Sequence, residues 1–362
     1  MTVFWLICTV ALLMLCQVVY YNRWGTDHIR YERYFSRDRV FAGDTLELIE
    51  VLTNDKLIPI PWARVESRIS PYLRFGHQAD LDVNMDRFHK SVFFLGSYKK
   101  ITRRHRVEAT RRGYYDCTLS ALTVGDLFGL STKTTDMSVA AKLFVYPAIT
   151  PPDALPDEAL EWQGDVSVRR WIDPDPILVC GIREYLPGDS QRDVHWAATA
   201  RTGQLQVKVR DYTISPKLLV LFNSQITENL WAAMEPMQRE FLENGVSISA
   251  ALAAWGSRQG MEVGFRTNGG SKLAPSDKEL TVSVDPAPGN LDAVLEAMAL
   301  LEIKMQLNFS LLLDAEIARR TTNMDILCVS AYWSQELETR AQTLRAMGNS
   351  VVHIPITGGE AK

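Results

Sequence analysis

The sequence predicts a multi-domain α+β fold with one N-terminal transmembrane helix, a β-sandwich and a C-terminal α/β domain with a doubly wound sheet. Three observations predict it. Residues 1–22 contain no charged side chain, short β-type runs separated by turn residues fill 28–147, and apolar runs alternate with helical segments over 216–358. With 362 residues, of which 46% are hydrophobic, the chain is long enough for two domains with separate cores.

Residues 1–22 are expected to form a transmembrane anchor. As a helix, the uncharged run 2–21 is about 30 Å long, the thickness of the hydrocarbon core of a bilayer. A cleavable signal peptide is the alternative, but no basic segment precedes the run and no small-residue cleavage site ends it. Basic residues follow the helix and none precedes it, which predicts a single-pass protein of the cell membrane with the bulk of the chain in the cytoplasm. They are Arg23, Arg30, Arg33, Arg37 and Arg39.

Residues 28–147 are punctuated like an all-β domain. Glycine, asparagine and proline turn signals separate short runs, and we expect an immunoglobulin-like sandwich of about seven strands. The run 45–52 alternates except at Leu48-Ile49, where a bulge would restore the pattern. The single histidines of the chain have no neighbours with metal-ligand spacing and are interpreted as ordinary surface or satisfied residues. They include His28, His77, His89, His105 and His353.

A basic run at 99–112 is opposed only by Glu108. One interpretation is contact with anionic lipid headgroups, because this domain is tethered beside the membrane. The other, which we favour, is a solvated edge strand whose charges block pairing with a second sheet edge. The candidate lipid-contact residues are Arg103, Arg104, Arg106, Arg111 and Arg112.

The segment 181–215, called the signature unit below, has the clearest local pattern. Pro187-Gly188 is a turn signal, and Asp189 and Ser190 are both N-cap residues. A helix is therefore predicted over 191–201, ended by Gly203 in the left-handed conformation. Alternating runs on both sides make the unit strand, capped helix, strand.

The flanking segments are predicted from proline content and periodicity. Residues 148–180 form a Pro-rich connector that we expect to be ordered but irregular. The α/β domain, 216–358, begins with a buried strand at 217–223, followed by a helix over 228–259 with a break near Asn244-Gly245. Further strands are predicted at 261–266, 325–330 and 350–355, and further helices at 290–302 and 335–347.

The pattern R-E-Y-x-P-G-D-x-x-R-x-[IV]-x-W followed by T-A-R-x-G resembles the signature of the domain of unknown function 58 (DUF 58) family. Its positions here are Arg183, Glu184, Tyr185, Pro187, Gly188, Asp189, Arg192, Val194, Trp196, Thr199, Ala200, Arg201 and Gly203. Two motifs of the sandwich segment, 111–115 and 125–130, are similar to the family's R-R-G-x-Y and D-P-F-G-L, with Leu127 in place of the proline. The resemblance supports the sandwich and implies a degenerate von Willebrand factor A-like domain at the C-terminus.

The same resemblance bears on metal binding. A working domain of the von Willebrand A type holds a metal through D-x-S-x-S at the end of its first strand, where carboxylate and hydroxyl oxygens suit Mg²⁺. At the matching positions this chain has Phe222, Ser224 and Ile226. The leading aspartate is absent, and the neutral amide of Asn223 is a poor substitute, so no metal site is predicted. No phosphate-binding loop or dinucleotide fingerprint occurs either, and no cofactor is expected.

One hypothesis for the polar residues of the signature unit is that they are catalytic. Asp189, Ser190 and His195 lie close in sequence, but catalytic triads are assembled from distant segments, and Ser190 has a sufficient role as a cap. The alternative is a structural and recognition role. Trp196 is then expected to be a core anchor beneath the helix. The charged residues would hold the helix on the α/β sheet, form a docking face, or both; they are Arg183, Glu184, Asp189, Arg192 and Arg201.

The function predicted first is a membrane-tethered, non-enzymatic adaptor. The family resemblance implies a MoxR-type AAA+ ATPase as its protein partner. The net charge of −4 gives no general bias toward nucleic acid. Two alternatives stay open: a membrane-bound hydrolase using Asp189, Ser190 or His195, and a ligand-adhesion domain, which would need the opposite orientation and a cation.

Overall fold

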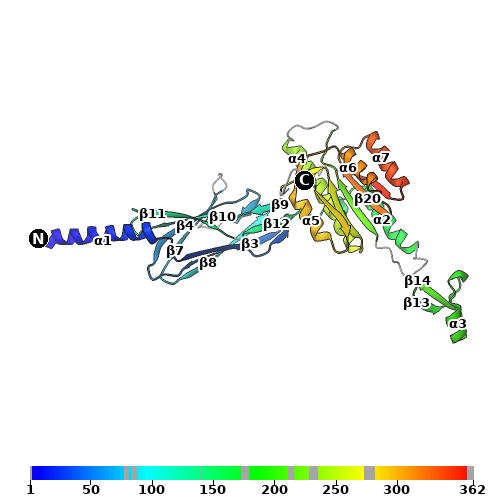
Figure 1. Cartoon of the computed structure of the whole chain (residues 1–362), viewed down its shortest axis with the longest axis horizontal. Coiled ribbons are helices and arrows are strands. Elements are labelled where there is room, and N and C mark those ends of the chain that lie inside the picture. Colours follow the sequence, from blue (N-terminus) through cyan, green and yellow to red (C-terminus); the bar gives the residue numbers. More distant parts are fainter. Residues whose placement is uncertain are drawn as a thin grey trace. The chain divides into compact units, whose positions relative to one another are not determined.

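The computed structural model describes residues 2–76, 81–83, 88–139, 141–172, 179–210, 216–227, 235–272 and 282–356. The chain divides into two compact units, Met1–Ala148 and Ile149–Lys362, whose elements are labelled in Figure 1. The boundary falls where the predicted sandwich gives way to the Pro-rich segment.

The first element is the apolar helix α1 (Thr2–Trp24), the one helix among the described residues that is long and apolar enough to cross a membrane. None of the residues in its most apolar window is buried inside the protein. Its last carbonyls are satisfied by Lys56, whose Nζ donates to the oxygens of Trp24 at 3.0 Å and Gly25 at 2.7 Å. The end of α1 is therefore bonded to the β-domain of the same unit.

The rest of the first unit is a β-sandwich that is mostly antiparallel. Its larger sheets have the orders β1-β3-β8-β5 and β11-β10-β4-β7-β6, and a third sheet has the order β2-β12-β9. Leu48, Phe93 and Leu122 belong to one buried core between the larger sheets. The bounds are β1 Ile29–Phe35, β2 Arg39–Phe41, β3 Thr45–Asn54, β4 Ile60–Arg68, β5 Leu73–Phe75, β6 Leu81–Val83, β7 Phe88–Leu95, β8 Lys100–Ala109, β9 Gly113–Asp116, β10 Leu119–Gly125, β11 Thr132–Ser138 and β12 Lys142–Tyr146.

The strand number and the predicted bulge both differ from expectation. The described residues of this unit form twelve strands, because short segments such as β2 and β5 pair separately instead of continuing their neighbours. β3 pairs without a register shift along both β1 and β8, so there is no bulge at Leu48-Ile49. Its inward positions are Leu46, Leu48, Glu50 and Leu52. The apparent break in alternation arises because one inward position is a glutamate.

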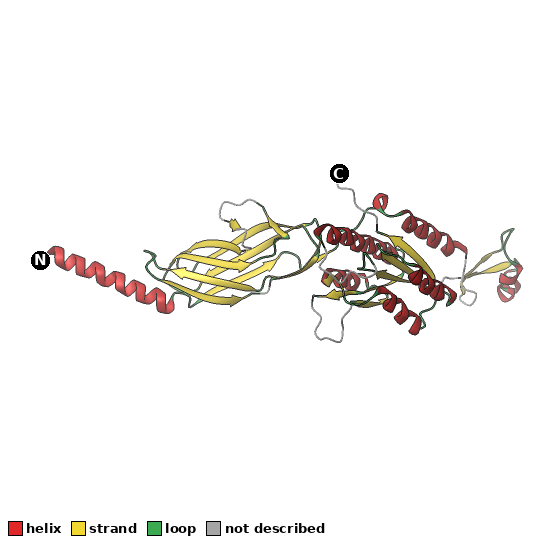
Figure 2. Ribbon diagram, turned by 90° about the horizontal axis from the view of Figure 1, so that it is seen from above, coloured by secondary structure: helices red, strands yellow, loops and turns green. Residues whose placement is uncertain are grey.

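The second unit contains a five-stranded sheet of order β18-β16-β15-β20-β21, parallel except for the edge strand β18. The order reverses between β15 and β20, as the predicted doubly wound sheet requires. Helices cover both faces (Figure 2). The bounds are β15 Lys217–Phe222, α4 Pro236–Arg258, β16 Glu262–Thr267, β17 Gly269–Ser271, β18 Ser283–Ala287, α5 Leu291–Leu300, β19 Leu301–Met305, α6 Phe309–Ala318, β20 Met324–Ser330, α7 Gln335–Ala346 and β21 Ser350–Pro355.

The alternation of β15 explains its two layers. Leu219 and Leu221 belong to the core cluster with α6 and α7. Side chains at the intervening positions point the other way: Leu218 lies against Gly256 of α4, and Phe222 lies against Gly245. Every residue of β15 after Lys217 is buried, which is typical of a strand covered on both faces.

The Pro-rich connector is more regular than predicted. It holds a short 3₁₀ helix, η1 (Pro152–Ala154), and a helix of 16 residues, α2 (Asp157–Ile172). Its prolines flank α2 and leave its interior free, and Pro156 directly precedes the first turn, where a proline costs no hydrogen bond. Trp162 of α2 is buried and packs edge-on against Trp255 of α4, with ring centroids 5.1 Å apart. The connector is thus part of the second unit's core.

The predicted break in α4 is absent. The helix runs unbroken from Pro236 to Arg258, while residues 228–234 of its predicted start lie outside the described residues. Gly245 is a site of close approach: a Cβ there would lie 2.5 Å from Ile356 Cδ1 and 2.9 Å from Phe222 Cε2. Gly245 therefore makes room for Phe222.

We expect Gly245→Ala to destabilise the second unit by about 1–3 kcal/mol, because the added methyl group overpacks a closed core. Gly164→Ala in α2 is the matched control, since a Cβ there has nothing within 4 Å. Hydrogen-exchange mass spectrometry of peptides from α4 and β15 measures the local stability. Equal protection in the two variants would contradict the packing explanation.

Candidate functional site

The signature unit is described up to Arg210. The two predicted strands are β13 (Val179–Glu184) and β14 (Gln206–Arg210), and they pair antiparallel. The segment between them holds a 3₁₀ turn, η2 (Gln191–Asp193), and a helix, α3 (Trp196–Thr202). The single predicted helix is thus two pieces. It is interrupted because Val194 is buried and bridges to Val207 of β14. Its predicted end is confirmed: Gly203 is left-handed, with φ of 73°, and its N–H donates to Thr199.

Each helical piece has its own polar cap. The hydroxyl of Ser190 accepts the N–H of Arg192 at 3.3 Å, at the start of η2. His195 caps α3, because its Nδ1 accepts the N–H of Ala198 at 3.0 Å. Both side chains therefore satisfy backbone donors that would otherwise be orphaned.

An ion pair closes the turn that precedes η2. The guanidinium of Arg183 donates two parallel hydrogen bonds, of 2.6 and 2.7 Å, to the carboxylate of Asp189. Asp189 Oδ2 also accepts the N–H of Leu186 at 2.8 Å. The hydrogen bonds from Arg183 and Leu186 lower the pKa of Asp189 to about 2, so its carboxylate is ionised at any physiological pH. Gly188, with φ of 113°, supplies the left-handed position of the turn.

The structure contradicts the expected place of Trp196. This side chain is 70% exposed at the first position of α3, instead of being a core anchor beneath the helix. Val194 and Val207, both buried, form the apolar contact beneath α3. Other large apolar side chains of the unit are also exposed, namely Ile182, Leu186 and Leu205.

The charged residues of the signature are distributed over the surface of the unit. Glu184, Arg192 and Arg201 are exposed, and Tyr185 is half-buried. Arg183 and Asp189 bond to each other and to backbone groups within the unit. The structure thus brings together the first strand and the turn, while Arg192 and Arg201 lie on the separate helical pieces.

A second candidate region is the carboxyl end of the sheet, where the strand order reverses. Phe222 is fully buried on β15, on the side of α4. Asn223 Nδ2 donates to Ser330 Oγ at 2.8 Å, and Asn223 Oδ1 accepts from Asn268 Nδ2 at 3.0 Å. Ser224 in turn donates its N–H and hydroxyl to Asn268 Oδ1. All these side chains are buried, so neutral amides and hydroxyls link the ends of β15, β16 and β20.

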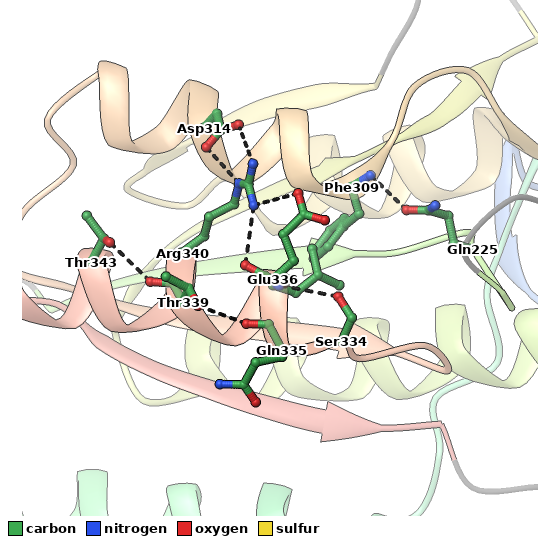
Figure 3. Close-up of polar contacts among 10 residues, drawn as sticks. Gln225, Phe309, Asp314, Ser334, Gln335, Glu336, Thr339, Arg340 and Thr343 are labelled. Atoms are coloured by element: carbon green, nitrogen blue, oxygen red, sulfur yellow. Dashed lines mark hydrogen bonds and ion pairs between the residues drawn. The ribbon is translucent and has the colours of Figure 1, made fainter.

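The same region receives the N-terminus of α6. Gln225 Oε1 accepts the N–H of Phe309 at 2.7 Å, which satisfies a donor at the start of the helix (Figure 3). Figure 3 also shows Arg340 of α7 joined to Asp314 of α6 by bonds of 2.8 and 3.1 Å. The amide of Gln225 thus occupies a position where an anion often binds in other proteins. Of the predicted degenerate metal positions, Phe222 and Ser224 are both committed to packing or hydrogen bonds, and Ile226 is half-buried beyond them.

Comparison with known proteins supports the signature. The family model described as "Protein of unknown function DUF58" matches residues 181–281. The match begins at the first residue of the signature unit and continues through β16. The DUF58 resemblance is therefore found independently over the signature unit and over Asn223, Ser224 and Asn268 of the second region, while Phe309 and Ser330 lie outside the match.

One relative and two solved structures have further similarity. An uncharacterized protein of Bacillus subtilis (strain 168), YeaD, is 22% identical over 231 residues, which cover 63% of this chain and 56% of that protein. A non-cellulosomal cohesin from Archaeoglobus fulgidus is 10% identical, with a TM-score of 0.23, over 34% of this chain and 95% of the cohesin. A CARDB domain from Pyrococcus furiosus is 16% identical, with a TM-score of 0.20, over 32% of this chain and 90% of that domain. TM-scores of this size establish neither a shared fold nor a shared function.

Sequence reasoning missed a buried polar cluster in the sandwich. Glu50 accepts hydrogen bonds from Tyr31 at 2.6 Å and Ser91 at 2.7 Å, and lies 2.9 Å from His105 Nε2. His89 is also buried, with Nδ1 3.8 Å from the carboxylate. The prediction that these histidines are isolated is wrong, because strands distant in sequence bring them to one glutamate. The only sequence signal was the glutamate at an inward position of β3.

This cluster also has the residue types of a metal site. The ligand atoms of Glu50, His89 and His105 lie within 4.8 Å of one another. However, Arg33 is fully buried with Nε 3.9 Å from Glu50 Oε1. It already neutralises the carboxylate, and a divalent cation beside it would be repelled. We therefore interpret the cluster as a buried polar node that joins the two sheets.

The candidate lipid-contact residues do not share one surface. Arg104 and Arg106 are exposed on one side of β8. Arg103 lies on the other side over the ring of Phe93, 4.3 Å from its centroid. Arg112 is buried, and Arg111 lies 5.0 Å from the ring centroid of Tyr72. Lipid contact by this run stays a prediction, now confined to Arg104 and Arg106 on steric grounds.

We expect His89 to make the sandwich acid-sensitive. Burial lowers the pKa of His89 to about 4, against an ordinary value of 6.5. Between these two pH values the unfolded chain binds a proton that the folded chain does not. The free energy of unfolding therefore decreases as the pH is lowered from 6.5 to 4, by about 3 kcal/mol in total. Burial alone would raise the pKa of Glu50, but His105, His89, Arg33 and Tyr31 together lower it, so its carboxylate stays ionised in the folded state.

His89→Leu should remove most of this pH dependence, and His28→Asn, at an exposed position, should leave it intact. Hydrogen exchange of peptides from β7, corrected for the intrinsic effect of pH, measures it between pH 4 and 6.5. A slope that survives in His89→Leu would show that another group is responsible.

Proposed function

We propose that this chain is a membrane-tethered, non-enzymatic adaptor whose signature unit binds a protein partner. The observation that carries the proposal is the exposed Trp196 on a helix with fixed ends. Tryptophan is among the residues that contribute most when a protein interface closes over it. The same small unit also exposes Ile182, Leu186 and Leu205, and several large apolar side chains on one surface unit are typical of a protein interface.

The local caps support a rigid docking site. His195 fixes the start of α3, and Gly203 fixes its end. The Arg183–Asp189 pair fixes the turn that leads into the helical pieces. A preorganised surface loses little conformational entropy on binding, so more of the contact energy appears as affinity.

The alternative of a hydrolase has less support from the geometry. A serine nucleophile needs a base within hydrogen-bond reach, and the base needs a third group that orients it. Here Ser190 caps η2, His195 Nδ1 caps α3, and Asp189 is held by Arg183. Each of the three side chains has a separate structural partner.

The proposed partner is a MoxR-type AAA+ ATPase, as the DUF58 resemblance implies. The exposed Arg192 and Arg201 favour a partner surface with acidic groups around an apolar pocket for Trp196. The proposed von Willebrand A-like sheet, with its carboxyl end closed by amides, then acts as a scaffold.

The test is binding of a purified MoxR-type ATPase to the full-length protein in nanodiscs, with and without ATP. We expect Trp196→Ala to weaken binding by about 2 kcal/mol, or roughly 30-fold. Met237→Ala, which truncates another exposed apolar side chain of the second unit, should have no effect. Equal affinity of Trp196→Ala and wild type, or no binding of the ATPase in any nucleotide state, would refute the proposal.

A probe for activated serine separates the adaptor from the hydrolase. We expect no labelling of the folded wild-type protein. Labelling that disappears in Ser190→Ala and in His195→Ala, with hydrogen exchange of β13 and β14 unchanged, would establish the hydrolase instead.

A further inference from the structure

One end of the sandwich is bonded to the last turns of α1. Gln17 Nε2 donates to Asp126 Oδ2 at 3.1 Å, and the hydroxyl of Tyr21 donates to the carbonyl of Pro59 at 2.7 Å. Lys133, at the start of β11, donates to the carbonyl of Arg23 at 2.7 Å. The loop between β10 and β11 and the loop between β3 and β4 therefore both lie beside the helix.

The β10–β11 loop is a closed turn with apolar side chains at its tip. Asp126 is fully buried and accepts the N–H of Ser131 at 3.1 Å, which ties the two ends of the loop together. Between them Leu127 is 66% exposed, Phe128 56% and Leu130 65%. Gly129, with φ of 71°, provides the left-handed position. An ordered loop thus presents three large apolar side chains that the protein does not cover.

The contact with Gln17 gives the depth of this loop. Gln17 precedes the end of α1 at Trp24 by seven residues, or about 10 Å along the helix. Tyr20 and Tyr21 lie between Gln17 and Trp24, and aromatic residues of this kind mark the boundary of the hydrocarbon in membrane helices. A loop bonded at Gln17 lies at or just inside that boundary.

We propose that the β10–β11 loop inserts Leu127, Phe128 and Leu130 into the lipid bilayer beside α1. The proposal rests on the proposed membrane tether and is independent of the protein partner. Lipid is the fitting occupant because Asp126, which directly precedes the exposed apolar residues, is bonded to Gln17 of a helix whose own apolar side chains are exposed. The membrane also explains the Gln17–Asp126 bond, since a polar amide at this depth needs a partner from the protein.

The neighbouring loop agrees with this placement. Leu57 is exposed and follows Lys56, which caps α1. The backbone N–H of Tyr98 donates to the carbonyl of Lys56, and the side chain of Tyr98 is exposed. Lys133 is placed at the level of Arg23, where anionic headgroups would meet both charges. The sandwich would thus contact the bilayer through the apolar side chains of two loops, in addition to its attachment to α1.

The test measures the depth of a bimane label in nanodiscs of phosphatidylcholine and phosphatidylglycerol. A cysteine is introduced singly at Phe128 in the loop, at Leu119 at the opposite end of β10, or at Leu12 in the middle of α1. The full-length chain has Cys8, Cys16 and Cys180 changed to alanine and keeps Cys117 and Cys328, which are buried. Leu119 is the matched control, since it is apolar and 78% exposed. Quenching by doxyl-labelled lipid and by aqueous iodide is compared, and Leu130→Cys gives a second reporter on the loop.

The expected result is strong lipid quenching and loss of iodide quenching at positions 128, 130 and 12, with the reverse at 119. Lipid quenching at 12 combined with iodide quenching at both 128 and 130 would overturn the loop insertion while leaving the tether intact. Iodide quenching at 12 as well would overturn the tether itself, and the insertion with it.

Discussion

The Arg183–Asp189 ion pair is the constraint on which the signature unit depends. It joins the end of β13 to the turn before η2, and the same carboxylate holds the N–H of Leu186. Because guanidinium and carboxylate meet with two parallel bonds, the pair fixes direction as well as distance. The low pKa of Asp189 keeps this arrangement at every pH a cell experiences. The caps of α3 fix both ends of the helix that carries Trp196, so this side chain is exposed at a defined position.

The second unit has the topology of a ligand-binding sheet, and among its described residues the switch point is occupied by neutral side chains. In open α/β sheets, ligands bind at the carboxyl ends of the strands where the order reverses. Here Asn223, Asn268 and Ser330 fill that place with neutral groups that satisfy one another. Phe222, at the end of β15, packs toward Gly245 of α4. The sheet therefore holds a closed network of amides and hydroxyls at its carboxyl end, which agrees with the scaffold role proposed for it.

The first unit is held together by a charge at its centre. Glu50 stays ionised in the core because Tyr31, Ser91, His105 and Arg33 surround it. Removing one partner would leave an uncompensated charge in the apolar core, which is strongly destabilising. The polar contacts of Glu50 therefore hold the two sheets together. Lys56 and Gln17 bond the sandwich to α1, which couples the position of the sandwich to this apolar helix.

Local signals allowed much of this organisation to be predicted. β21 (Ser350–Pro355) has its predicted bounds, and Gly203 ends α3 as expected, because periodicity and glycine caps act over a few residues. The predictions for Glu50 and Trp196 depended on distant partners and were wrong. In the sequence, Glu50 only interrupts the alternation of a strand. No local pattern shows that two histidines and an arginine lie beside it in the fold. Trp196 was assigned to the core by residue type alone, although its burial depends on what the unit packs against.

The most direct test of the account places a photo-crosslinking amino acid at position 196 in living cells. The account predicts adducts with one protein, a MoxR-type ATPase, from position 196 and none from the exposed control position 237. The absence of any protein adduct at 196, or the same adducts from both positions, would contradict the claim that the signature unit is a docking site.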